Sequence, residues 1–342
     1  MCAQFPSLLS QGRPTARLAP LRVLVTGASG GVGSLLAPRL ALAGHSVRTF
    51  GRDAERIDEA LAALLPEAEA EEVEIVSGDA LSGVGLDRAL DGIDVAYYLI
   101  HSMERTALGA SPFAERDRLA AENFAAAAER AGVPRIVYLG GLVPRPVPGD
   151  GIAQSSRHLA SREQVERILL AASPDPVALR ASIVIGERSR SFRFLVRLVE
   201  RMPVLTLPAW YRFATQPIDA RDVNEMLVAS ATAELPRPIL EIAGPDVLTY
   251  GEMITTIAEA LLVRRPSLRL RVSATAVTAR VAAAIASEDP ELVLPLMEGL
   301  QGDLLPARDD AAELLGVSLH SFASAVEHAL GEWEELEPLR AR

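Results

Sequence analysis

The sequence predicts an α/β fold, a doubly wound parallel sheet with a smaller, mainly helical C-terminal lobe. Two observations support this: short β-branched apolar runs alternate with helical patterns through the first half of the chain, and a glycine-rich turn joins the first run to the first helix. After Gly186 the alternation stops. We expect a flexible extension over residues 1–20, a dinucleotide-binding domain over 21–186 and a substrate or partner lobe over 187–342.

Each half of the chain has its own predicted elements. The first half has strands at 21–26, 46–50, 73–76, 95–100, 136–139 and 177–185, with helical segments at 33–43, 53–65, 87–90, 114–131 and 158–172. The second has helices near 191–201, 220–233, 249–263 and 277–299, with isolated strands near 239–242 and 268–272.

Composition limits the function classes. The chain has 342 residues, 49% of them apolar, which predicts a folded globular protein. Its net charge of −11 argues against nucleic acid as a partner. All 34 basic residues are arginine, so no lysine can act as a base or phosphate clamp.

Targeting and metal signals are weak. Cys2 is the only cysteine, which excludes an intrachain disulfide and a cysteine zinc cluster, and fits a cytoplasmic protein. The apolar stretches are too short or too charged for a transmembrane segment. We expect no metal site, and the sequence leaves the oligomeric state open.

The glycine turn at 26–33 is the main motif. It follows a predicted strand and opens a predicted helix, the context in which small residues admit a dinucleotide pyrophosphate to a helix amino terminus. The alternative is a tight turn without a ligand. The predicted contacts are Gly27, Ser29, Gly30, Gly31, Val32 and Gly33.

Residues after the next strands set the choice of cofactor. Arg52 follows the second strand, where it could meet a 2′-phosphate, so NADP(H) is favoured over NAD(H); alternatively Arg52 is a solvated surface charge. Asp79 could reach the adenine or be an ordinary turn aspartate. The cofactor set is completed by Ala80, Leu99 and Ile100, and His101 lies at the same edge.

The chain resembles a known superfamily. Thr-Gly-x-x-Gly-x-x-Gly at 26–33, Gly78-Asp79 and a helix beginning near His158 are similar to extended and atypical short-chain dehydrogenase/reductases. The stretches at 98–103, 158–162, 215–218 and 243–246 resemble the NmrA-like and YbjT-like NAD(P)-binding branch. The resemblance covers about residues 21–335 and implies a Rossmann fold.

The superfamily's catalytic residues are missing. Its enzymes use a Tyr-x-x-x-Lys pair and a strand serine, whereas this chain has His158 and Arg162 at that spacing and Leu139-Gly140-Gly141-Leu142 at the strand end. His158 could replace the tyrosine as general acid while Arg162 contacts the ribose or phosphate. Alternatively the pair only binds cofactor or forms a polar helix face.

Two further features have two interpretations each. Arg180 could line the nicotinamide pocket or be buried against a carboxylate. The aromatic residues Trp210, Tyr211 and Phe213 could line a substrate pocket or pack the second lobe.

Two functions remain possible. The first is NADPH-dependent hydride transfer to an apolar carbonyl, enone or quinone-like compound bound between the lobes, with His158, Arg162 and His101 as catalytic candidates. The second is a non-catalytic NAD(P)(H)-binding redox sensor or assembly protein, which the NmrA-like resemblance implies. A DNA-binding regulator is disfavoured by the charge.

Overall fold

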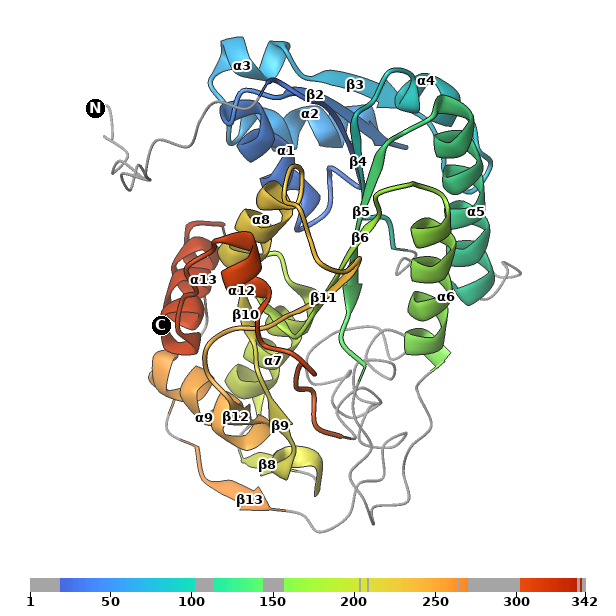
Figure 1. The fold of residues 1–342 in the computed structure, drawn as a ribbon. Helices are drawn as coiled ribbons and strands as arrows, with labels where there is room; N and C mark the ends of the chain where they lie inside the picture. Colours follow the sequence, from blue (N-terminus) through green and yellow to red (C-terminus); the bar gives the residue numbers. More distant parts are fainter. Residues whose placement is uncertain are drawn as a thin grey trace.

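A seven-stranded parallel sheet forms the centre of the molecule (Figure 1), in a computed structural model that describes residues 19–101, 113–143, 157–202, 204–207, 209–263, 265–269, 302–336 and 339. Its strand order is β11-β6-β5-β4-β1-β2-β3. The strands are β1 Arg22–Thr26, β2 Ser46–Gly51, β3 Glu74–Ser77, β4 Val95–Tyr98, β5 Arg135–Gly141, β6 Val177–Ala181 and β11 Ile239–Ile242. The predicted doubly wound α/β class is confirmed.

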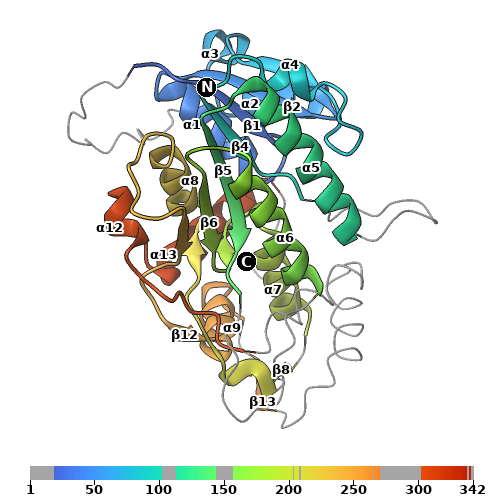
Figure 2. The same cartoon turned by 45° about the vertical axis from the view of Figure 1, so that its right-hand side comes forward.

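Helices cover both faces of the sheet (Figures 1 and 2). One face packs against α1 Gly33–Leu42, α2 Ala54–Ala62, α8 Ala220–Ala229 and α12 Ala311–Leu315. The other packs against α4 Leu86–Leu90, α5 Phe113–Ala131 and α6 Arg157–Ala171. The short α3 Glu67–Glu71, which was not predicted separately, lies beside α1 and α2. All four residues of β4 are buried, as expected for a central strand covered on both faces.

The sheet corrects two sequence predictions. The run at 239–242 is not an isolated strand, because β11 pairs in parallel with β6 and forms one edge of the sheet. The single strand predicted over 177–185 is divided: the Ser182 N–H donates to the Ile242 carbonyl at 3.0 Å, and β7 Val184–Ile185 then pairs with β10 Ile218–Asp219. A short apolar run shows its strand propensity but not its partner, which is why both were wrong.

A second hydrophobic core is built by elements that lie to the left of the sheet and below it in Figure 1. It is built by α7 Arg190–Arg201, α9 Tyr250–Ala260, α13 Phe322–Leu336, β8 Leu205–Leu207 and the 3-10 helix η1 Ala209–Arg212. Small pairings border it, between β9 Ala214–Thr215 and β12 Leu248–Thr249, and between β13 Ser267–Arg269 and β8. The predicted helix at 277–299 and most of the predicted N-terminal extension lie outside the described residues.

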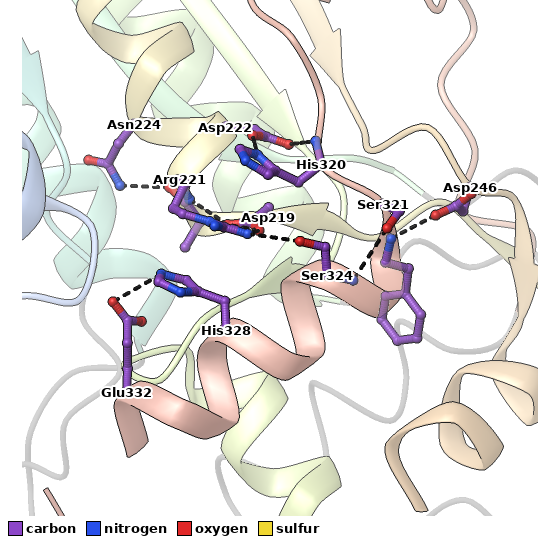
Figure 3. A network of polar contacts seen from close by, with 12 residues as sticks. Asp219, Arg221, Asp222, Asn224, Asp246, His320, Ser321, Ser324, His328 and Glu332 are labelled. Atoms are coloured by element: carbon purple, nitrogen blue, oxygen red, sulfur yellow. Dashed lines mark hydrogen bonds and ion pairs between the residues drawn. The ribbon is translucent and has the colours of Figure 1, made fainter. Parts of the chain in front are cut away.

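The chain beyond Gly186 also contributes to the core between the sheet and α1, through α8, β11 and α12. A polar network fixes α13 to α8 (Figure 3). The Asp222 carboxylate, fully buried, accepts from the His320 backbone N–H at 2.8 Å and lies 2.5 Å from its Nδ1. Burial raises the pKa of Asp222, and the contacts with His320 oppose that rise. The division at residue 186 remains a prediction.

The described residues contain neither a membrane-spanning helix nor a metal-binding cluster. No helix there is long and apolar enough to span a membrane. The same residues hold no group of three or more His, Cys, Asp or Glu side chains arranged to bind a metal ion.

The glycine turn gives a stability prediction. A Cβ at Gly33 would lie 2.4 Å from the Gly27 carbonyl oxygen, so Gly33→Ala should lower the free energy of unfolding by about 1–3 kcal/mol. The control is Gly331→Ala in α13, where a Cβ meets nothing within 4 Å and should raise stability by up to about 1 kcal/mol. Denaturant unfolding of both variants measures the difference, and an unchanged Gly33→Ala would contradict the packing.

Candidate functional site

A cavity of about 590 Å³ opens at the carboxyl ends of the sheet strands. It borders the ends of β1 and β4, where the strand order reverses and doubly wound sheets bind their ligands. The glycine turn lines it from the first half of the chain, and α7, Tyr250 and Leu304 line it from the second half. The cavity therefore takes residues from both halves of the chain.

The glycine turn is shaped by close backbone contacts. Gly27 has φ +70°, a conformation that favours glycine, and a Cβ there would lie 3.0 Å from the Leu99 carbonyl oxygen. The Gly30 N–H donates to the Gly27 carbonyl at 2.9 Å. Because α1 begins at Gly33 with no acidic residue in its first turn, its amino terminus offers a positive potential to an anion. A turn of this shape fits a pyrophosphate.

Thr26 joins the two strands beneath the turn. Its buried hydroxyl donates to the Tyr97 carbonyl at 2.9 Å and accepts from the Leu99 N–H at 3.1 Å. This fixes the chain that leaves β4, so Leu99 and Ile100 line the cavity.

The far end of the cavity contains the residues predicted for the adenosine half. Arg52 and Ser29 both line it. Asp53 caps α2 by accepting from the Arg56 N–H at 3.1 Å, so it has a structural role. Asp79 also lines the cavity while accepting from the Leu81 N–H at 3.1 Å, and thus serves the turn as well.

His101 and Arg162 meet at the other end. Arg162 Nη1 lies 3.3 Å from His101 Nε2, and both residues line the cavity. Burial raises the pKa of the Tyr138 hydroxyl to about 12, and the positive charge of Arg162 opposes that rise. His158 lies on α6 one turn before Arg162, but its side chain is outside the described residues.

The remaining predicted contacts share this cavity. Its lining includes Gly27, Ser29, Gly30, Gly31, Val32, Gly33, Arg52, Asp79, Ala80, Leu99, Ile100, His101 and Arg162. Their roles toward a ligand are predictions.

Sequence reasoning missed the loop after β7. Glu187 and Arg188 line the cavity, and Arg188 Nε donates to Glu187 Oε1 at 2.7 Å. Burial raises the pKa of Glu187, the nearby Glu332 carboxylate raises it further, and Arg188 opposes both. The available signal was a charged pair directly after an apolar strand, at the edge where the glycine turn lies.

The two open interpretations now have answers. Arg180 makes a two-bond pair with the buried Glu166, at 2.6 and 2.9 Å, so the burial interpretation is confirmed. Trp210 packs edge-on against Tyr250. Trp210 and Phe213 both belong to the second core, and neither lines the cavity. Packing therefore explains these two aromatic residues.

Comparison with known proteins agrees with this geometry. Residues 27–184 match a family model described as NAD(P)H-binding. Residues 27–184 therefore carry an NAD(P)H-binding domain. A comparison with curated proteins found no match.

Solved structures of similar fold bind NAD or act on nucleotide sugars, as their descriptions state. The Bacillus cereus UDP-glucuronic acid 4-epimerase, in complex with UDP-glucuronic acid and NAD, is 17% identical with a TM-score of 0.66 over 93% of this chain and 100% of its own. Bordetella bronchiseptica WbmG in complex with NAD is 17% identical, TM-score 0.67, over 94% and 96%. A Staphylococcus aureus nucleoside-diphosphate-sugar epimerase is 15% identical, TM-score 0.67, over 90% and 100%. At these identities the likeness shows the fold alone.

The Thr26 contacts give a second prediction. Thr26→Val keeps the shape but removes the hydroxyl, leaving the half-buried Leu99 N–H without this acceptor, and should cost about 1–3 kcal/mol of unfolding free energy. Thr26→Ser keeps the hydroxyl and is the matched control. Equal stability of the valine variant and the wild type in denaturant titration would show that this bond does not hold the strand ends together.

Proposed function

We propose that the protein uses NADP(H) to reduce the carbonyl group of a small apolar molecule bound between its two halves. The contact between His101 and Arg162 carries this proposal. It puts a titratable ring and a fixed positive charge in the cavity wall of a chain that lacks the usual tyrosine and lysine.

Arg162 sets the state of His101. A guanidinium donates and cannot accept hydrogen bonds, so His101 Nε2 must be the unprotonated acceptor and Nδ1 must carry the hydrogen. The adjacent positive charge also disfavours imidazolium. A neutral imidazole can still donate its Nδ1 hydrogen to a carbonyl oxygen and stabilise the negative charge that develops there.

The reaction balances with these groups. NADPH, when bound, supplies the hydride for the carbonyl carbon. His101 stabilises the resulting oxyanion through its Nδ1 hydrogen, and because His101 is exposed, the product oxygen can take its proton from water at that side. Arg162 keeps the ring oriented and contacts the ribose or phosphate.

The substrate half of the cavity supports an apolar compound. Its wall includes Ile183, Phe194, Leu195 and Leu304. Such a wall excludes water around a carbonyl, which strengthens the hydrogen bond from His101. We place the protein in the NmrA-like branch and in the cytoplasm on the sequence resemblance and its single cysteine.

The choice of NADP(H) can be tested at Arg52. Arg52→Gln should weaken NADPH binding about tenfold and leave NADH binding unchanged, because only NADPH carries the 2′-phosphate that Arg52 would meet. Arg56→Gln, an exposed arginine on α2 outside the cavity lining, is the control. Fluorescence titration measures both affinities. An equal loss for the two nucleotides would refute the 2′-phosphate role.

The catalytic role of His101 can be separated from binding. His101→Phe should lower kcat for a panel of ketones and quinones by about 100-fold while the Kd for NADPH stays the same, since the lost group acts on the substrate oxygen. His158→Phe is measured in parallel, and His328→Gln, which lies outside the cavity, is the control. A loss confined to His158→Phe would assign the role to α6 instead.

The missing tyrosine and lysine favour a second candidate, a non-catalytic redox sensor. A sensor must bind oxidised and reduced cofactor with different affinities, since equal affinity shifts no equilibrium. Wild-type protein that binds NADPH, turns over no member of the panel and binds NADP⁺ with a clearly different Kd would replace the reductase proposal with this one.

A further inference from the structure

We propose that Arg188 is a second arm of the dinucleotide site, which contacts the pyrophosphate from the loop after β7 that packs against the glycine turn. The inference rests on the proposed cofactor binding and adds a phosphate ligand from outside the glycine motif. It also gives the loop after β7 a role in holding the cofactor.

Arg188 lies directly over the glycine turn. A Cβ at Gly31 would be 3.0 Å from both the Arg188 Cβ and its carbonyl oxygen, so a side chain at position 31 would require this closely packed loop to shift. Arg188 Nη1 donates to Ser34 Oγ at 2.8 Å. Ser34 is fully buried in the first turn of α1, at the helix terminus that would face the phosphates.

The guanidinium has donors left for an anion. Nε is used by Glu187 and one Nη1 hydrogen by Ser34, while Nη2 has no partner among the described residues. An arginine has five N–H donors, so three remain. The side chain is only 32% exposed and lines the cavity. A partly desolvated guanidinium with a free edge fits two phosphate oxygens.

Glu187 orients the Arg188 guanidinium through one hydrogen bond, to Nε. Its carboxylate fixes Nε, which leaves the Nη edge directed away from Glu187. The charged groups near it are Arg188 and Glu332, and Glu332 is itself 3.2 Å from His328. Replacing Glu187 with glutamine keeps an acceptor for Nε and removes one negative charge from the cavity wall.

Three probes distinguish this arm from the 2′-phosphate site. Arg188→Gln should weaken NADPH and NADH about tenfold each and leave adenosine 2′-monophosphate, which has no pyrophosphate, unaffected. Arg52→Gln should show the opposite pattern, losing NADPH and adenosine 2′-monophosphate but not NADH. Arg56→Gln should change none of the three. Glu187→Gln should bind both dinucleotides at least as tightly as the wild type.

The outcomes separate the two proposals. Wild-type protein that binds neither NADPH nor NADH overturns the proposed function, and the inference with it. Wild-type binding with unchanged dinucleotide affinity in Arg188→Gln overturns the inference alone. If Arg188→Gln does not fold, Arg188→Lys decides: a charge without the planar fork should weaken both dinucleotides, and wild-type affinity in that variant would contradict the arm.

Discussion

The cavity depends on one hydroxyl group, that of Thr26. It ties the end of β1 to the end of β4 at the point where the strand order reverses. A Cβ at position 27 would lie 3.0 Å from the Leu99 carbonyl oxygen, and the φ of +70° there favours glycine. The tight turn that follows starts α1 at Gly33, and the helix terminus then faces the cavity. Strand pairing thus places this helix terminus at the cavity.

Local patterns were enough to predict the first five strands and the glycine turn, whereas the sixth predicted strand is divided into β6 and β7. A β-branched run such as β1, ended by glycine, leaves little choice of structure. They were not enough for β11, which is separated from its partner β6 by the whole of α7 and α8. They also could not show that Arg162 contacts His101, because that contact joins the end of β4 to α6 across 61 positions of the chain.

The absence of lysine changes the chemistry that this site can perform. In the related enzymes, as the resemblance implies, an ammonium group lowers the pKa of a tyrosine on the same helix. Here the tyrosine nearest to Arg162 is Tyr138 on β5, and burial keeps its pKa above the usual value despite the positive charge. Tyr138 therefore stays protonated and does not supply a phenolate. Under the proposed function, the group that faces a substrate oxygen is the imidazole of His101.

Charge is distributed unevenly between the surface and the cavity. The chain carries −11 overall, yet the described lining residues include Arg52, Arg116, Arg162, Arg188 and Arg190 against only Asp79 and Glu187. Low-dielectric walls concentrate the field of such a cluster, whereas the acidic surface repels extended polyanions. The same charge pattern that disfavours nucleic acid therefore admits a small phosphate-bearing ligand. Because arginine keeps its charge at any physiological pH, this attraction does not depend on the titration of the cationic groups.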